Sequence, residues 1–166
     1  MSRPIQYQNG SVEFLGRTFL TDPRALIPRF ETKFLVSKTI AWCTQRDLQR
    51  TWSIIDVGTG SGVIAISLAL ELPIATITAI DASASALALA SENALRHKVV
   101  DKVRLTHRDL LTGFNGPADI IVANLPYLPT ERILHLDASV RDFEPHEALD
   151  GGTDGLELYR RLFRQI

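Results

Sequence analysis

Cysteine is almost absent from this sequence. Cys43 is the only one in 166 residues, so no disulfide can form within the chain, and a reducing compartment, the cytoplasm, is expected. No apolar run has the length of a membrane span, and residues 1–10 lack the apolar core of a signal peptide. The net charge of −1 lacks the basic excess that direct contact with nucleic acid normally needs. The four histidines have no metal-ligand spacing, so no metal site is expected.

What the chain does contain is an alternation of strand-like and helix-like segments. Its 45% hydrophobic and 22% charged residues are ordinary for a globular protein, and its length suits one core-bearing domain. Unbroken apolar runs of strand length occupy residues 54–57, 74–80, 103–106 and 120–123. Such runs are typical of parallel strands that are covered on both faces. The order predicts an α/β fold with a doubly wound, mostly parallel sheet.

The remaining elements are expected around this sheet. Residues 12–20 read as a β-hairpin around a glycine-containing turn. A helix is expected over about 31–48, with Phe34, Leu35 and Trp42 on its buried stripe, and another over 63–72, apolar on all sides. Two further helices are expected. One follows the N-cap Ser83, with Leu87, Ala90, Ala94 and Leu95 inward; the other follows Thr153 or Asp154, with Leu156, Tyr159 and Phe163 on one face.

A glycine-rich loop, Asp56-Val57-Gly58-Thr59-Gly60-Ser61-Gly62, joins the first apolar run to a helix. Glycines let a backbone turn sharply and let a ligand approach closely, and a helix N-terminus offers free N–H donors. The alternative is a tight turn without a ligand. The dinucleotide fingerprint requires glycine where Val63 stands, and no Lys-Ser or Lys-Thr follows as in a P-loop. The loop therefore predicts a nucleotide-type cofactor of another kind.

Two aspartates extend this candidate site. Asp81 ends the second apolar run, where a carboxylate can accept hydrogen bonds from ribose hydroxyls. Asp109 follows the third run, on the same edge of the sheet, and could accept from an adenine amino group. A helix-flanking residue and a surface turn are the respective alternatives.

The tetrapeptide Asn124-Leu125-Pro126-Tyr127 follows the fourth run. The Asn124 side-chain oxygen and the Leu125 backbone carbonyl could each accept one N–H of a flat amide or amino group. Tyr127 could stack on that group and exclude water. An ordinary strand-ending turn is the alternative. With a reactive group held opposite by the glycine loop, the tetrapeptide predicts a catalytic clamp for an acceptor nitrogen.

These motifs resemble those of a known family. The loop resembles that of class I S-adenosylmethionine-dependent methyltransferases, and Asn124–Tyr127 resembles the Asn-Pro-Pro-Tyr motif of amino-methyltransferases. Residues 26–32, Leu-Ile-Pro-Arg-Phe-Glu-Thr, and residues 144–156, from Glu144 to Leu156, are similar to flanking motifs of the HemK/PrmC-type protein glutamine methyltransferases.

The resemblance implies a Rossmann-like fold and methyl transfer from S-adenosylmethionine, with S-adenosylhomocysteine as product. The acceptor it implies is a glutamine side-chain amide in the Gly-Gly-Gln loop of peptide chain release factors. Asp56, Gly58, Thr59, Gly60, Gly62, Asp81, Asp109 and Asn124 would bind the cofactor. Asn124, Leu125, Pro126 and Tyr127 would be catalytic, and Asn124, Pro126, Tyr127 and Glu144 would contact the substrate.

Two departures from the family pattern set further expectations. Leu125 replaces the first proline of the motif, which makes the loop less stiff. The family usually has an N-terminal helical domain and about seven strands, for which this chain has no room. We therefore expect a hairpin segment over 1–28 and a methyltransferase domain over 29–166 that lacks its C-terminal strands. A partner chain would cover the exposed edge at 120–123. The alternative functions are an adenine amino-methyltransferase and an inactive cofactor-binding remnant.

Overall fold

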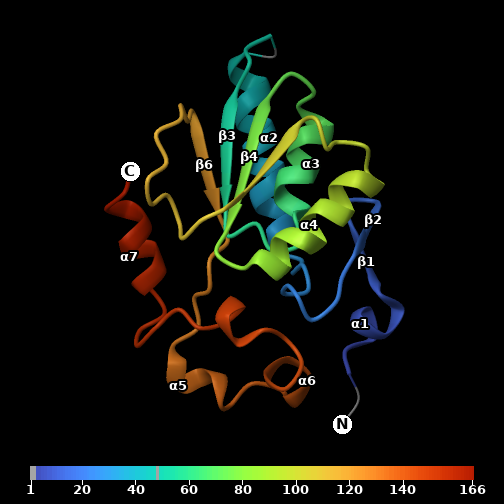
Figure 1. Ribbon diagram of the computed structural model, residues 1–166, viewed down its shortest axis with the longest axis vertical. Coiled ribbons are helices and arrows are strands. Elements are labelled where there is room, and N and C mark those ends of the chain that lie inside the picture. The colour runs from blue at the N-terminus through green and yellow to red at the C-terminus, as the bar shows by residue number, and fades with distance from the viewer. Residues whose placement is uncertain (1–2, 48) are drawn as a thin grey trace.

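The computed structural model describes residues 3–47 and 49–166 of the chain. Its helices and strands alternate through the middle of the sequence, as the apolar runs predicted (Figure 1). The elements are α1 (Ile5–Asn9), β1 (Ser11–Phe14), β2 (Arg17–Leu20), α2 (Thr32–Arg46), β3 (Ser53–Val57), α3 (Val63–Glu71), β4 (Thr76–Asp81), α4 (Ala84–Arg96), β5 (Val103–His107), β6 (Ile120–Ala123), α5 (Thr130–Ile133), α6 (Ala138–Arg141), the 3-10 helix η1 (His146–Ala148) and α7 (Glu157–Phe163).

The central sheet is parallel, with strand order β5-β4-β3-β6. The chain builds outward from β3 to β5 and then returns to place β6 on the other side of β3, so the sheet has a topological switch point between β3 and β6. Ligands of such sheets bind beyond the carboxyl ends of the strands at that point. The expected α/β fold and the separate antiparallel hairpin β1–β2 are both confirmed.

The two faces of the sheet are covered differently. One face packs against α2, α3 and α4. Phe14 and Phe19 of the hairpin belong to the same hydrophobic core. The other face packs against α7 through Leu162 and Leu158. Figure 1 shows α7, in red, next to the edge strand β6, and the segment with α5 and α6 beyond the carboxyl ends of the strands. The division at residue 28 stays a prediction.

The existence of each expected helix is confirmed, but three of the predicted buried faces are wrong in part. In α2 the buried residues are Thr32, Val36, Thr39 and Cys43. Phe34 is 60% exposed and Trp42 38%, because these four residues, spaced i, i+4, i+7 and i+11, form the helix face that is buried. The expected end of this helix at residue 48 lies outside the described residues. Arg46 is the last residue of α2.

The other two corrections concern α4 and α7. Leu95 of α4 is 70% exposed. The predicted N-cap of α4 is confirmed, because the Ser83 side chain accepts a hydrogen bond from the Ala86 N–H. In α7 the buried residue is Leu162, whereas Phe163 and the preceding Leu156 are exposed. The predicted cap at Thr153 or Asp154 is wrong, because the N-cap residue is Leu156. No helix in residues 3–47 and 49–166 combines the length and apolarity needed to cross a bilayer.

Candidate active site

A cavity of about 490 Å³ lies at the carboxyl edge of the sheet, at the switch point. That volume is within the range of small-molecule and cofactor sites. Three parts of the chain that the sequence singled out line it: the glycine loop, the ends of β4 and β5, and the tetrapeptide after β6. The predicted residues in the lining are Gly58, Thr59, Gly60, Asp81, Asp109, Asn124, Leu125 and Pro126.

The glycine loop has a conformation that only glycine adopts easily. Gly58, Gly60 and Gly62 have φ values of +74°, +56° and +83°, a region that a Cβ atom disfavours. A Cβ on Gly58 would lie 2.9 Å from a methyl group of Leu125. The loop and the tetrapeptide are therefore in direct contact across the switch point.

Asp56 lies behind this loop and not in the cavity lining. Its Oδ2 accepts hydrogen bonds from the Thr59 hydroxyl at 2.6 Å and the Ala65 N–H at 3.1 Å. Its Oδ1 is buried and has no partner among the described residues. Burial raises the pKa of Asp56 to about 7, although both hydrogen bonds oppose the shift. The carboxyl group thus holds the loop, and its predicted contact with the cofactor stays a prediction.

The raised pKa of Asp56 predicts a pH-dependent stability. The folded pKa of about 7 lies above the ordinary value of 3.8, so the folded state retains a proton that the unfolded state loses. The retained proton therefore stabilises the folded state, and this stabilisation is complete below the unfolded pKa of 3.8. It amounts to about 4 kcal/mol and is lost as the pH rises to about 7.

Asp56→Asn should remove this contribution, because the amide does not titrate. We expect the variant's unfolding free energy, relative to that of the natural chain, to increase from about pH 4 to about pH 7 and then stay constant. Urea unfolding of both proteins across this range measures the difference. Parallel pH profiles would show that Asp56 is ionised in the folded protein.

Asp81 and Asp109 take part in different contacts at the cavity. Asp81 accepts from the Gly60 N–H at 2.8 Å and from the Ser83 N–H at 2.9 Å, and burial raises the pKa of its carboxyl group. Since a carboxylate has about four acceptor sites, further hydrogen bonds remain open to it. Asp109 forms an ion pair with Arg161 of α7 and is more exposed.

The tetrapeptide begins where β6 ends. The Asn124 Nδ2 group donates to the Thr32 hydroxyl oxygen at 3.2 Å, and the Asn124 Oδ1 atom has no hydrogen-bond partner among the described residues. Leu125 is buried, and its N–H donates to the Tyr159 hydroxyl at 3.2 Å, which in turn donates to the Leu125 carbonyl at 3.4 Å. Tyr127 is 57% exposed and lies outside the cavity lining. Its expected stacking on an acceptor stays a prediction.

The glycine run after residue 150 packs against the tetrapeptide. A Cβ on Gly151 would lie 2.8 Å from the Pro126 carbonyl oxygen, and one on Gly155 would lie 2.2 Å from that of Tyr127. The Gly151 N–H also donates to the Leu128 carbonyl at 2.8 Å. The sequence identified this run only by resemblance. Its glycines are needed because the two segments approach backbone to backbone.

Gly155→Ala is expected to lower the unfolding free energy by about 2 kcal/mol or more, because the Tyr127 carbonyl must move and φ is positive. Gly16→Ala is the matched control. Gly16 has a φ of +70°, close to the +79° of Gly155, but open space where its Cβ would lie. Chemical denaturation measures the unfolding free energy of both variants. Gly16→Ala reports the backbone strain alone, and the additional loss in Gly155→Ala reports the contact with Tyr127. Equal losses would mean that the approach to Tyr127 is unimportant.

Glu144 holds the segment that precedes α2. One carboxylate oxygen accepts from the Ile27 N–H at 3.0 Å, and the other from the Arg29 guanidinium at 2.7 Å. The carboxylate is almost completely buried, and Glu144 is not in the cavity lining. This geometry favours a role in positioning residues 27–29, and the predicted substrate contact stays a prediction.

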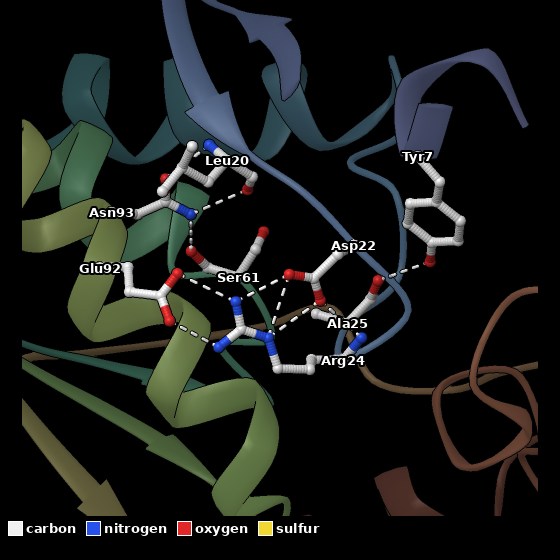
Figure 2. Close-up of polar contacts among 8 residues, drawn as sticks. All are labelled: Tyr7, Leu20, Asp22, Arg24, Ala25, Ser61, Glu92 and Asn93. Atoms are coloured by element: carbon white, nitrogen blue, oxygen red, sulfur yellow. Dashed lines mark hydrogen bonds and ion pairs between the residues drawn. The ribbon is translucent and has the colours of Figure 1, made fainter. Parts of the chain in front are cut away.

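The hairpin and the following loop are fixed to the glycine-loop side of the sheet by residues that no sequence motif indicates. Asn93 of α4 is fully buried; its Oδ1 accepts from the Leu20 N–H, and its Nδ2 donates to the carbonyls of Leu20 and Ser61 (Figure 2). Arg24 lies between Asp22 and Glu92 and pairs with both. Ser61 belongs to the glycine loop, so Asn93 joins the loop to the hairpin.

One family model matches the central part of the chain. The family model described as ribosomal protein L11 methyltransferase (PrmA) matches residues 37–138, well over half of the chain. The match includes the glycine loop, both aspartates and the tetrapeptide, but not the segments at 26–32 and 144–156.

Curated relatives match these flanking segments as well. A release factor glutamine methyltransferase of Geobacter sulfurreducens is 40% identical over 160 residues, covering 96% of this chain and 54% of the relative. One of Moorella thermoacetica is 43% identical over 160 residues, covering 96% of this chain and 55% of the relative. The chain spans about half the length of the curated relatives it matches.

Solved structures show the same fold. The catalytic domain of hMettl16, in complex with the MAT2A 3′UTR hairpin 6, has a TM-score of 0.65 at 16% identity, covering 97% of this chain and 69% of that chain. A ribosomal protein L11 methylase of Lactobacillus delbrueckii subsp. bulgaricus has a TM-score of 0.51 at 29% identity, covering 78% of this chain and 60% of that chain. The chain belongs to the ribosomal protein L11 methyltransferase (PrmA) family of methyltransferases, and its relatives confirm the resemblance to the HemK/PrmC-type release factor glutamine methyltransferases.

Proposed function

We propose that this chain transfers a methyl group from S-adenosylmethionine to a glutamine side-chain amide of a protein, in the Gly-Gly-Gln loop of a peptide chain release factor. The position of Asn124 supports the proposal most strongly. Asn124 lines the same cavity as the glycine loop, and its only side-chain hydrogen bond among the described residues uses Nδ2, which leaves Oδ1 free. The glutamine specificity in the names of the relatives supports the choice of acceptor.

S-adenosylmethionine is the cofactor of this family, and the cavity residues fit it. The cavity volume of about 490 Å³ suits a nucleoside-sized ligand, and the glycine loop leaves space that side chains would fill. Asp81 would accept from the ribose hydroxyls with the acceptor sites that its backbone contacts leave open. Asp109 would accept from the adenine amino group. The bound cofactor supplies an electrophilic methyl group on a sulfonium.

The tetrapeptide would orient the acceptor. The Asn124 Oδ1 atom and the Leu125 carbonyl would each accept one N–H of the glutamine amide, which fixes the direction of the nitrogen and increases its electron density. The Tyr159 hydroxyl accepts from the Leu125 N–H and donates to the Leu125 carbonyl. These two contacts would keep the carbonyl in place. Pro126 and Tyr127 would exclude water from the amide.

We propose the cytoplasm as the compartment and a further polypeptide segment as cover for β6. The single thiol, Cys43, is buried, which suits a reducing compartment. Within the described residues β6 pairs only with β3, so its other edge has free backbone groups that a strand of another chain could pair with.

Separate methylation assays with different acceptors test which class of molecule is methylated. The chain is incubated with labelled S-adenosylmethionine and either a release factor, the same factor with its Gly-Gly-Gln glutamine changed to alanine, or adenine-containing DNA and RNA. We expect label only in the natural release factor. Label in nucleic acid would favour the adenine amino-methyltransferase, and cofactor binding by calorimetry without any transfer would identify a binding remnant.

A further inference from the structure

We propose that Thr32 is a positioning residue that holds the Asn124 amide with its oxygen available to the acceptor. The proposal rests on the proposed function, because it concerns the orientation of the residue that would accept the substrate N–H. No sequence motif pointed to a contact between these residues, which lie 92 positions apart in the chain.

The contact is placed where it can control the amide. Thr32 is the first residue of α2 and is only 5% exposed. Both Thr32 and Asn124 line the cavity. The Thr32 hydroxyl oxygen accepts one Asn124 Nδ2–H at 3.2 Å, which places the donor end of the amide at Thr32 and leaves its acceptor end free.

The direction of this amide matters because its two ends have similar shapes and opposite hydrogen-bonding properties. Only the oxygen end can accept an N–H from a glutamine side chain. If the NH₂ end faced the substrate instead, two donors would meet and the nitrogen of the substrate would not be held. In the structure the Thr32 hydroxyl accepts from Nδ2, so the oxygen end of the Asn124 amide is left for the substrate, which is the productive orientation.

The position of Thr32 is itself fixed by the buried carboxylate described above. Glu144 holds Arg29 and the Ile27 N–H, and the Arg29 carbonyl accepts the Thr32 N–H at 3.2 Å. The first turn of α2 is thus connected through Arg29 to a residue that follows α6. This chain of contacts gives Glu144 an indirect role at the active site.

Thr32→Val and Thr32→Ser test the proposal. Valine keeps the shape of threonine but cannot accept a hydrogen bond, whereas serine keeps the hydroxyl. We expect Thr32→Val to lower kcat for release-factor methylation about tenfold or more, with an unchanged dissociation constant for S-adenosylmethionine. Thr32→Ser should restore kcat to near the natural value. Equal kcat in the natural chain and Thr32→Val, or an equal loss in both variants, would overturn the proposal.

A measurement on the unsubstituted chain does not depend on variants or activity. Nuclear Overhauser effects from the Asn124 Nδ2 protons to the Thr32 side chain are expected, since the donor end of the amide faces Thr32. Their absence in an assigned spectrum would contradict the proposal. If the natural chain transferred no methyl group, the proposed function would fail, while this spectrum would still decide the contact.

Discussion

Asn124→Ala is expected to lower kcat for glutamine methylation by about 100- to 1,000-fold, with an almost unchanged dissociation constant for S-adenosylmethionine. The alanine variant lacks the Oδ1 acceptor that would orient the acceptor nitrogen, and the loss of one preorganised hydrogen-bonding group in an active site typically has an effect of this size. Steady-state methylation of a release factor and calorimetric titration with the cofactor measure the two quantities.

Asn115→Ala is the matched control. Asn115 is exposed and lies outside the cavity lining, so its substitution should change neither kcat nor cofactor affinity. Near-normal turnover by Asn124→Ala would mean that the tetrapeptide is not the clamp. An equal loss of cofactor binding and turnover would assign Asn124 to the cofactor instead of the acceptor.

Asn93→Ala is expected to lower the free energy of unfolding by about 3 to 4 kcal/mol. Its three hydrogen bonds, to both backbone groups of Leu20 and to the Ser61 carbonyl, are at 2.7, 3.0 and 2.9 Å. Alanine removes the partner of these backbone groups, of which the Ser61 carbonyl is buried and those of Leu20 partly buried, and each such loss costs about 1 kcal/mol or more. Urea unfolding measures the change.

Glu92→Ala, at the adjacent position, is the control for Asn93→Ala. Its carboxylate pairs with Arg24 and is 48% exposed, and exposed ion pairs contribute about 0 to 1 kcal/mol. We also expect Asn93→Ala, but not Glu92→Ala, to weaken cofactor binding, because Ser61 is part of the glycine loop. Similar losses in both variants would show that the bridge between hairpin and loop is not important for stability.

Much of the fold could be predicted because its signals are local. Unbroken apolar runs predicted β3, β4, β5 and β6, and the Ser83 cap predicted the start of α4. The buried faces of the helices were harder, because apolar residues occur on more than one face of α2 and α7. Trp42 packs against Trp52 at a ring distance of 5.1 Å and stays partly exposed, a result that depends on tertiary packing and not on periodicity.

In the candidate site, too, features with a local sequence signal could be predicted and contacts that depend on tertiary packing could not. The glycine loop, the two aspartates and the tetrapeptide each lie at or just after the end of a strand, so a parallel sheet brings them to one edge. The contacts of Thr32, Asn93 and Tyr159 join positions far apart in sequence, and nothing local in the chain indicates them. Glu144 was identified by its motif, but its partners at residues 27 and 29 became visible only in the folded chain.

Methylation of a glutamine amide is the proposed activity on which these residue roles depend. The most direct measurement is tandem mass spectrometry of a release factor after incubation with S-adenosylmethionine and the 166-residue chain. We expect one added methyl group, on the side-chain nitrogen of the Gly-Gly-Gln glutamine. A methyl group on another residue, or none in a protein that binds the cofactor, would contradict it.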